Sequence, residues 1–367
     1  MLEVRPVAER RALHRFVDLP WRLHAGSAWV PPLRSDVLGV LDPVKNPFFR
    51  HSTAALFLAE RDGEAVGRIA AIENRRHLET YRDSTGFFGF FESVDDPEVA
   101  AALFDRAAAW LTERGLRRLR GPTSFTINDE SGLLLDAFDL PPVVGMSYNP
   151  PYYPGLVEGY GFTKAQDLLA FRLRPAEVPA RLAAARPALA CQGIVLRPIR
   201  LRRLDEEVRR IHQVHSQAWA GNWGAVPLTD GELRWMAGEL RRIADPDLVL
   251  IAEHHGRPVG ISVTIPDANQ VLRHLNGRLF PTGFLRWLWW SRRKDALRVL
   301  ALGVLEGYRR RGLDAAMVAE TISTGLRKGY RWAEMSWILE SNLPMRRLLA
   351  RLGAEAYKTY RIYDLDL

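Results

Sequence analysis

Apolar and polar positions follow the same pattern in two segments that lie far apart in the chain. Residues 57–72 read FLAERDGEAVGRIAAI and residues 250–265 read LIAEHHGRPVGISVTI, with Ala, Glu, Gly, Val, Gly and Ile at a constant offset. Each segment is an apolar run, a tight polar turn at Gly63 or Gly256, and a second apolar run. This pattern is typical of a β-hairpin, so the sequence predicts two related hairpins.

The similarity continues beyond the hairpins. Residues 88–92 (FGFFE) align with residues 302–306 (LGVLE), and in each half a helical stretch follows and ends at a glycine, where helices commonly stop. Each half then repeats a strand, a helix and a final strand; the matched positions are Gly115 and Gly329, 116–121 and 330–339, Gly161 and Gly353, and Phe171 and Ile362. Chance similarity of two hairpins would not extend to element order and glycine positions over a whole domain.

Each half is therefore predicted as β, α, β-hairpin, β, α, β, α, β. The fold class is α+β, with a mixed, mostly antiparallel sheet flanked by helices in each half. We expect domains at 1–175 and 193–367, joined by an Ala/Pro-rich linker at 176–192. Shifts in the offset place an insertion at about 123–147 in the first half and at about 267–294 in the second.

Composition limits the class of protein. The 367 residues, 47% hydrophobic and 26% charged, suffice for two globular cores. The single cysteine, Cys191, cannot form an internal disulfide, which favours a reducing compartment. The start of the sequence does not read as a signal peptide, and no apolar run is long enough to span a bilayer. We therefore expect a cytoplasmic protein that could touch the inner membrane peripherally.

The net charge of +8 favours phosphate, nucleic acid or anionic lipid as a partner. Nearly all the basic residues are Arg, which can equally reflect genome composition, so charge alone decides little. No nucleic-acid reading module is present, and we expect no nucleic-acid partner. His212 and His215 lie three apart on a predicted helix, but no further ligands are near them in sequence, so no metal is expected.

The stretch 299–313, VLALGVLEGYRRRGL, is where the sequence indicates chemistry. An apolar strand runs into a short basic turn with a glycine and then into an Ala-rich helix from about Leu313 to Lys328. The first turn of a helix presents free N–H groups to anions, and Arg309, Arg310 and Arg311 add three cations beside it. Gly312 allows a phosphate to approach the backbone. The stretch lacks both the Gly-Lys-Ser/Thr of a Walker loop and the three-glycine spacing of a dinucleotide fingerprint.

This motif resembles the acyl-CoA motif of the GNAT superfamily, which has Arg or Gln, two residues, Gly, one residue, then Gly or Ala. Arg309, Gly312 and Leu313 fit that pattern, and Asp314 departs from its last position. The resemblance implies two tandem GNAT-like domains and acyl-CoA as cosubstrate. Its thioester would lie where strands 297–305 and 331–339 diverge, near Leu302, a backbone N–H near Val304, and Asn342. The positions aligned with 309–312 in the first half are Asp-Asp-Pro-Glu, so that half is predicted to bind no CoA.

Candidates for the general acid and base lie on the last two predicted strands. The resemblance implies a Tyr four residues before Gly353, but Leu349 stands there. Tyr360, with its neighbours Tyr357 and Tyr363 on the last strand, could substitute, although aromatic residues on a strand usually pack in a core. Strand alternation places Glu334, Ser336, Ile338 and Glu340 on one face. Glu340 is our first prediction for the base and Glu334 the second; a salt bridge to an arginine is the alternative for each.

Three further segments are predicted around the acceptor. The loop 219–228 carries Asn222 and Trp223, and the segment 148–153 carries Tyr148 and Asn149, beside a polar loop at 126–130. We assign these four residues and Ser336 to the acceptor site, with simple packed turns as the alternative.

Residues 277–294, GRLFPTGFLRWLWWSRRK, mix aromatic and basic side chains. This mixture suits a peripheral membrane contact, a lid over an acyl chain, or packing on the other domain.

Long motifs at 219–229, 276–281, 334–342 and 357–363 make the chain similar to a subfamily of tandem GNAT proteins, which we associate with bacterial ceramide synthases. That resemblance implies transfer of a long-chain acyl group from acyl-CoA to the amine of a lipid such as a sphingoid base. Two other functions stay open: an acetyltransferase of a small soluble amine, and a non-catalytic acyl-CoA-binding protein.

Overall fold

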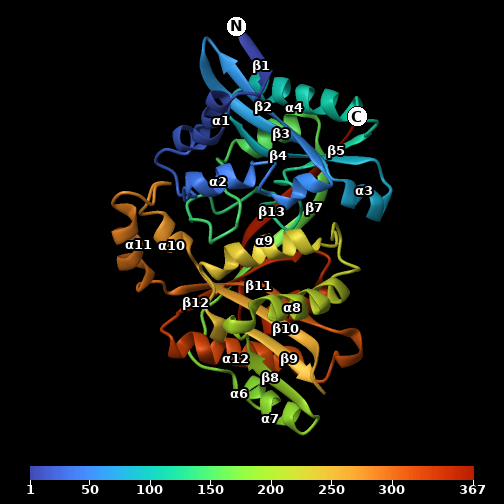
Figure 1. Ribbon diagram of the computed structural model, residues 1–367, viewed down its shortest axis with the longest axis vertical. Helices are drawn as coiled ribbons and strands as arrows, with labels where there is room; N and C mark the ends of the chain where they lie inside the picture. The colour runs from blue at the N-terminus through green and yellow to red at the C-terminus, as the bar shows by residue number, and fades with distance from the viewer.

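A single sheet runs through the whole molecule in the computed structural model, which describes residues 1–367 apart from the side chain of Leu240. Thirteen strands form the sheet, in the order β1-β2-β3-β4-β5-β13-β7-β12-β11-β10-β9-β8, with β6 paired to β13. The first half of the chain occupies one end of the long axis and the second half the other (Figure 1).

The elements of the first half are β1 (Leu2–Pro6), α1 (Arg10–Leu23), α2 (Arg34–Val40), η1 (Pro47–Arg50), β2 (Thr53–Arg61), β3 (Glu64–Glu73), α3 (Arg75–Tyr81), β4 (Thr85–Ser93), α4 (Pro97–Thr112), β5 (Arg118–Gly121), β6 (Leu133–Leu134), α5 (Tyr153–Tyr160) and β7 (Thr163–Leu173). Those of the second half are α6 (Ala180–Ala183), α7 (Ala185–Ala190), β8 (Ile194–Pro198), η2 (Leu201–Arg203), α8 (Leu204–Ala218), α9 (Asp230–Arg241), η3 (Pro246–Leu248), β9 (Val249–His254), β10 (Arg257–Pro266), α10 (Asn269–Leu272), α11 (Gly283–Ser291), β11 (Ala296–Val304), η4 (Glu306–Tyr308), α12 (Leu313–Arg327), β12 (Trp332–Leu339), α13 (Leu343–Arg351) and β13 (Glu355–Asp366).

The two halves exchange their final strands. β13, from the second half, lies between β5 and β7, while β7, from the first half, lies between β13 and β12. The strand order reads as two copies of one arrangement related by an approximate two-fold axis between β13 and β7. Each half therefore completes its sheet with a strand of the other.

Helices cover both faces of this sheet. In the first half, α4 and α5 cover one face around Phe88 and Phe104, and α1 covers the other around Phe16. In the second half, α12 covers one face and α8 the other. The insertion 267–294 forms α10 and α11, which project from the side of the molecule (Figure 1).

The predicted hairpins, central strands, long helices and closing strands are all present. The segment 176–192 differs from a simple linker, because it forms α6 and α7, which pack on α12 and bury Leu182 and Leu189. None of the helices in the described part of the chain has the length and apolar character needed to cross a membrane.

One expectation about β12 is wrong. Strict alternation placed Glu334, Ser336, Ile338 and Glu340 on one face. The pairing of β12 with β7 shifts register between Met335 and Ile338, and these two side chains pack in the same cluster. Since the shift reverses the faces, Glu334 and Ser336 share one buried face, whereas Ile338 does not, and Glu340 lies beyond the end of the strand.

Candidate active site

The parallel strands β11 and β12 diverge halfway along. Their pairing covers residues 296–299 of β11 against residues 332–335 of β12, and β11 then continues to Val304 paired with β10. The β10–β11 pairing also shifts register beside Leu300, which leaves that residue without a partner. An opening between two sheet strands, as predicted for the thioester, is therefore present in the second half.

The turn after β11 presents an open helix N-terminus. Gly312 is the N-cap of α12, with φ of 83°, and no side chain caps this end of the helix. Leu313, directly after it, is buried and anchors the first turn. Ala316 is the first residue of the helix whose N–H donates to a backbone carbonyl, that of Gly312. Within the described structure the N–H groups of Leu313, Asp314 and Ala315 therefore have no backbone acceptor.

Three exposed arginines surround this N-terminus. The Nε of Arg309 donates to the carbonyl of Val304 at 3.4 Å, and the guanidinium of Arg311 lies 5.1 Å from the ring centre of Tyr308. Arg310 has a left-handed φ of 63°. Free N–H groups, a helix dipole and three cations at one end of a strand opening are suited to a phosphate-bearing ligand.

The corresponding place in the first half is closed. Asp96 caps α4 by accepting from the N–H of Glu98 at 2.9 Å, and Arg61 pairs with both carboxylates at 2.8 Å. The N–H of Thr123 donates to the carbonyl of Phe88 at 2.7 Å, so the chain itself fills the space beside β4. The first half thus lacks the features that make the second half suited to an anion.

Leu302 and Val304 pack toward α12, and the opposite face of β11 is covered by α8. At Gly303 the ring of Trp219 lies so close that an added Cβ would be 2.2 Å from it. This position therefore requires glycine. Trp219 opens the loop 219–228, so that loop is fixed directly against the strand that is predicted to hold the thioester.

Glu334 is buried on β12 and holds two hydroxyl groups. Ser336 donates to its Oε1 at 2.6 Å, and Tyr357 of β13 donates to its Oε2. Burial and the neighbouring carboxylate raise the pKa of Tyr357, so that its hydroxyl stays protonated. Ser336 also lies 3.1 Å from the Sδ of Met146 in the first half. Glu334, Ser336 and Tyr357 thus form a hydrogen-bonded group at the buried face of β12.

A buried arginine that the sequence did not single out lies beside them. Arg298 of β11 pairs in register with Glu334, and its guanidinium is 5.3 Å from the ring centre of Trp337. Its Nε, the Nε1 of Trp337 and the hydroxyl of fully buried Tyr360 have no hydrogen-bond partner within the described residues. An apolar strand pattern interrupted by one arginine, RVLALGV, was the signal that could have revealed it.

Glu340 is engaged by neighbouring groups directly after the end of β12. Its carboxylate lies 2.7 Å from the Nζ of Lys164 and accepts from Gln166 and from the N–H of Asp167. The salt-bridge alternative is therefore realised, with a lysine in place of an arginine. Asn342 caps α13 through the N–H of Met345 at 3.2 Å. Both residues lie at the end of β12, where the sequence predicted them.

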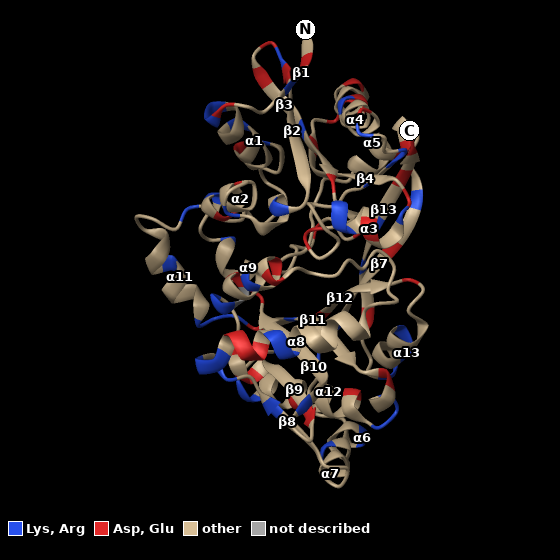
Figure 2. Cartoon of the chain, turned by 45° about the vertical axis from the view of Figure 1, so that its right-hand side comes forward, with Lys and Arg blue, Asp and Glu red and all other residues tan. Residues whose placement is uncertain are grey.

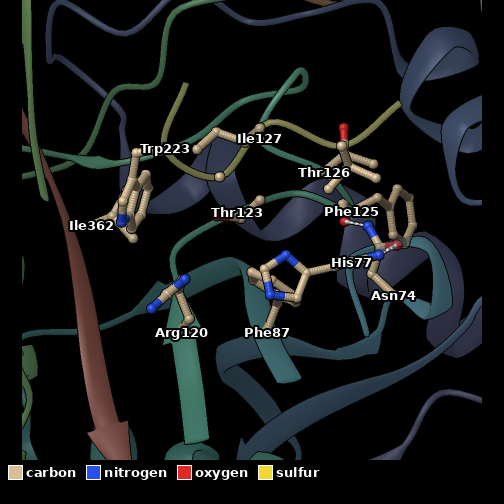
Figure 3. Close-up of a pocket in the computed structure, with 12 residues that line it drawn as sticks. Asn74, His77, Phe87, Arg120, Thr123, Phe125, Thr126, Ile127, Trp223 and Ile362 are labelled. Atoms are coloured by element: carbon tan, nitrogen blue, oxygen red, sulfur yellow. Dashed lines mark hydrogen bonds between the residues drawn. The ribbon is translucent and has the colours of Figure 1, made fainter. Parts of the chain in front are cut away.

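The predicted acceptor residues lie where the two halves meet. Trp223 stacks under the guanidinium of Arg120, 4.9 Å away, and joins His77, Phe125 and Ile127 around a hollow of about 10 Å³, too small for a substrate (Figure 3). Asn222, half-buried, adjoins Trp223 in the same loop.

Tyr148 and Asn149 are held by the first half itself. Tyr148 donates to the carbonyl of Phe138 at 3.0 Å, and Asn149 bonds the backbone of Leu134 through both ends of its amide. These contacts are typical of residues that hold a loop in shape. They agree with the alternative from the sequence, in which Tyr148 and Asn149 belong to a packed turn.

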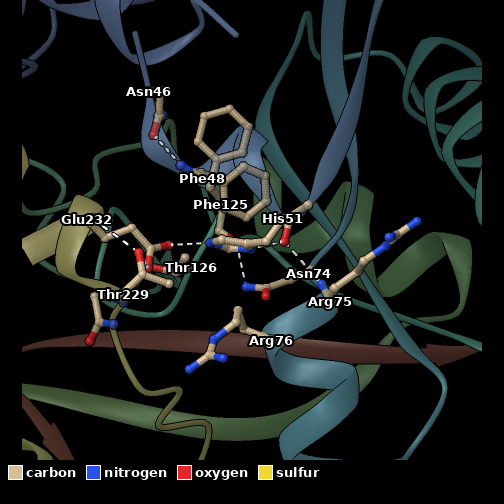
Figure 4. A network of polar contacts seen from close by, with 12 residues as sticks. Asn46, Phe48, His51, Asn74, Arg75, Arg76, Phe125, Thr126, Thr229 and Glu232 are labelled. Atoms are coloured by element: carbon tan, nitrogen blue, oxygen red, sulfur yellow. Dashed lines mark hydrogen bonds and ion pairs between the residues drawn. The ribbon is translucent and has the colours of Figure 1, made fainter. Parts of the chain in front are cut away.

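A polar network also connects the halves. Glu232 of α9 accepts from the N–H and hydroxyl of Thr229 at 2.7 and 2.8 Å, and its other oxygen lies 3.1 Å from the Nε2 of His51 in the first half (Figure 4). His51 in turn contacts Ser52, which accepts from the N–H of Arg75. The loop 219–228 and the helix after it are thus fixed to the first half at both ends.

Two acidic side chains in this region, Asp129 and Glu130, were included only as part of a polar loop. Both are exposed by area, yet the surrounding protein raises the pKa of Asp129 to about 6 and that of Glu130 to about 7, in each case mainly by desolvation. The sequence pattern identified this loop only as polar, because the effect of the surrounding protein on its two carboxyl groups depends on tertiary packing.

Comparison with solved structures identifies the class of the fold. The tandem GNAT protein from the clavulanic acid biosynthesis pathway matches with a TM-score of 0.58 at 15% identity, over 100% of this chain and 98% of that one. A GCN5-related N-acetyltransferase from Sphaerobacter thermophilus matches with a TM-score of 0.53 at 17% identity, covering 100% and 95%. No family profile matches the sequence. The fold is that of a tandem GNAT protein.

Sequence relatives define the family within that class. The chain is 36% identical to the bacterial ceramide synthase of Caulobacter vibrioides, over 100% of this chain and 98% of that protein. It is 34% identical to Protein YghO of Escherichia coli, over 99% and 95%. The chain belongs to the tandem GNAT family of the bacterial ceramide synthase, as the sequence motifs predicted.

Proposed function

We propose that this chain is an acyl-CoA-dependent N-acyltransferase that transfers a long-chain fatty acyl group to the amine of a lipid such as a sphingoid base. The observation that carries the proposal is the uncapped N-terminus of α12 with Arg309, Arg310 and Arg311 around it, at the end of the diverging strands. Backbone N–H groups and guanidinium groups are suited to the pyrophosphate of CoA. The name of the Caulobacter relative supports a fatty acyl donor and a lipid amine acceptor.

In this proposal the thioester lies between β11 and β12, beside Leu302 and Asn342. A backbone N–H near Val304 polarises its carbonyl, and the acceptor amine attacks from the side of Trp223, Asn222 and Ser336. Tyr360, Glu334 and Glu340 remain the acid–base groups predicted from sequence, and substitution of each tests its part. Tyr148 and Asn149 support the loop beside the acceptor.

We extend the proposal to a peripheral contact with an anionic membrane through residues 277–294. Along α11 the side chains of Phe284, Leu285, Leu288 and Trp289 are 46–67% exposed, and Phe280 is 73% exposed. Between Asp267 and Asp295 the sequence has five arginines, one lysine and no acidic residue, and none of these arginines forms a salt bridge within the described structure. An exposed apolar ridge with cations at its flanks is complementary to a headgroup layer. Figure 2 shows blue basic segments and no red acidic segment along the projecting helix α11.

Sedimentation with vesicles tests this contact. Binding to vesicles with anionic phospholipid should fall when Leu285 and Trp289 are both replaced by Glu, and it should be weaker on neutral vesicles. Val44→Glu, at an exposed apolar position on another surface, is the matched control. Equal binding by all three proteins would contradict the contact.

The first experiment on function is the thermal shift with CoA thioesters from acetyl to palmitoyl at matched free concentrations. Ligands that bind only the folded state raise the melting temperature with the logarithm of their concentration over Kd. We expect a shift that grows with chain length and is lost when Arg309, Arg310 and Arg311 are replaced by Ala. Replacement of the exposed Arg200, Arg202 and Arg203 by Ala removes the same three charges elsewhere and controls for net charge. An equal shift for all thioesters would favour a small-group acetyltransferase, and no shift would contradict the proposal.

A further inference from the structure

An open pocket of about 270 Å³ lies where the first half meets α9 of the second half. Each half contributes part of its lining, which consists of Lys45, Pro47, Arg50, Gly231, Arg234 and Trp235. Because α9 packs on α8, the pocket belongs to the side of the second half that α8 covers. The arginine turn at 309–311 precedes α12, which covers the opposite face of the sheet. The pocket is therefore separate from the turn that we propose for CoA.

The lining of this pocket is basic. Lys45, Arg50 and Arg234 contribute three cations, and no acidic side chain is among the lining residues. Within the described structure neither arginine forms a salt bridge, and Lys45 has only an exposed pairing with Asp42 at 3.4 Å. Exposed pairs of this kind contribute little. A negatively charged ligand would therefore meet positive charge that the protein itself does not neutralise.

The acid next to the pocket is already engaged, and its contact fixes the two walls of the pocket to each other. Glu232 accepts from the hydroxyl of Thr229 at 2.8 Å and lies 3.1 Å from the Nε2 of His51 (Figure 4). His51 follows Arg50 in the first half, and Glu232 follows Gly231 in the second. Because this contact joins the residues directly beside the lining, the walls are held in place before a ligand arrives, which lowers the entropy that binding costs.

The two arginines approach the pocket from opposite halves. A Cβ added at Gly231 would lie 3.2 Å from the Cβ of Pro47 and 3.5 Å from the Nη1 of Arg50. The guanidinium of Arg50 therefore reaches α9, and the glycine leaves the room that it needs. On α9 itself, the Nε of Arg234 donates to the carbonyl of Asp230 at 3.2 Å. Two guanidinium groups that line one pocket from two sides are suited to the oxygens of a single anion.

Trp235 adds an aromatic wall to the pocket. Its ring is half-buried, and its Cη2 would lie 3.9 Å from a Cβ added at Gly39, so α2 of the first half supports the ring. An aromatic face beside cations suits a ligand that has both a charged part and a flat apolar part. Three cations favour a doubly charged group, and a phosphate monoester is largely doubly charged at neutral pH because its second pKa is about 6.

We propose that this pocket is a second anion-binding site, which takes a small, soluble phosphate monoester with a flat apolar group. The site goes beyond the proposed function, since it shares no residue with the turn 309–312 or with the paired parts of β11 and β12. Because its walls come from both halves, a bound ligand contacts both and stabilises their arrangement.

The test is calorimetric titration with phenyl phosphate at constant ionic strength. The full chain is used both as wild type and with residues 309–311 replaced by Ala, so that the turn before α12 no longer competes for the probe. We expect both proteins to bind phenyl phosphate at the pocket. Replacement of both Arg50 and Arg234 by Ala should weaken this binding at least about 10-fold, and replacement of both by Lys should retain part of it. Replacement of the exposed Arg202 and Arg203 by Ala removes the same two charges elsewhere and should leave the affinity unchanged.

Inorganic phosphate separates the charge from the ring. Trp235→Leu should weaken the binding of phenyl phosphate by roughly 3–10-fold and leave that of inorganic phosphate unchanged. Equal effects on the two probes would overturn the role of the ring. Sedimentation with anionic vesicles should be the same for the wild type and for the protein without Arg50 and Arg234; a loss of vesicle binding would overturn the soluble ligand in favour of a lipid headgroup.

The proposal is wrong if the protein with residues 309–311 replaced by Ala binds no phenyl phosphate, or if binding survives the loss of Arg50 and Arg234. The thermal shift with palmitoyl-CoA tests the proposed function separately, because it depends on the turn before α12 and should be unchanged when Arg50 and Arg234 are replaced.

Discussion

The Nη1 of Arg298 donates to the carbonyl of Val144 at 2.6 Å, which joins β11 of the second half to a loop of the first. Gly145, the next residue, has φ of 72°, and a Cβ added there would lie 2.6 Å from the same Nη1. The first half therefore positions the buried guanidinium in the candidate active site. The insertion at 123–147 therefore helps to position Arg298, a role that the repeat pattern alone could not indicate.

Gly145→Ala should therefore destabilise the protein and displace Arg298. The left-handed backbone and the close guanidinium both oppose a Cβ, and we expect a loss of about 1–3 kcal/mol in the free energy of unfolding. Chemical denaturation measures this loss. Gly159→Ala in α5, where a Cβ meets open space at an ordinary φ, is the control and should be neutral or stabilising. Equal stability of the two variants would contradict the positioning role.

The N-terminus of α12 gives a second prediction, which separates binding from folding. Gly312 and Gly329 lie at opposite ends of that helix, with φ of 83° and 86° and no close neighbour for an added Cβ. Alanine at either position should cost about 1 kcal/mol of stability. Gly312→Ala alone should also weaken palmitoyl-CoA binding, by roughly 10-fold, because it disturbs the N–H groups that we propose bind the phosphate. Calorimetric titration of both variants checks this difference.

The hydroxyl groups on Glu334 give a third prediction. Tyr357→Phe and Ser336→Ala each leave one oxygen of a buried carboxylate without a donor, which should cost about 1–3 kcal/mol. Because both hydroxyls hold one group, the double variant should deviate from the sum of the single effects by at least about 0.5 kcal/mol. Tyr81→Phe, which removes a hydrogen bond to Ala225 at an exposed site, is the control. Additive losses would show that Glu334 does not couple the two.

Asp267 should make stability depend on pH in the acid range. It is buried, accepts from the N–H groups of Val144 and Asn269, and burial raises its pKa from 3.8 to about 6. The folded state therefore holds the proton more tightly, so this group's contribution is fully present below pH 4 and is lost as the pH rises to 6. The loss is on the order of 3 kcal/mol.

Asp267→Asn keeps an oxygen acceptor and removes the titration. The stability of the variant should consequently fall less between pH 4 and pH 6 than that of the wild type, in denaturation curves taken at several pH values. Parallel curves for the two proteins across this range would show that Asp267 ionises normally in the folded state.

Much of the fold follows from local signals. The turns at Gly63 and Gly256 and the helix ends at Gly161 and Gly353 mark boundaries because each has a backbone angle that favours glycine. The uncapped end of α12 with its three arginines is equally local, since it depends on consecutive residues. These features were predicted from the sequence.

The rest of the site depends on which strands become neighbours. Arg298 meets Val144, and Tyr357 meets Glu334, across 154 and 23 positions of sequence. The register shift in β12 is set by its pairing with β7, which periodicity cannot show. The raised pKa of Glu130 likewise depends on the protein packed around its loop. Side-chain chemistry at such places is defined by tertiary packing and not by spacing.

The exchanged strands also affect how the protein can be made. As the chain leaves the ribosome, the first half has all of its helices but lacks the neighbour of β5, because β13 is synthesised about 180 residues after β7. The edge of β5 must stay unpaired until then, and exposed strand edges invite wrong pairings. Maturation of both halves therefore waits for the same late segment, and a gene fragment encoding only one half would produce a sheet with an unprotected edge.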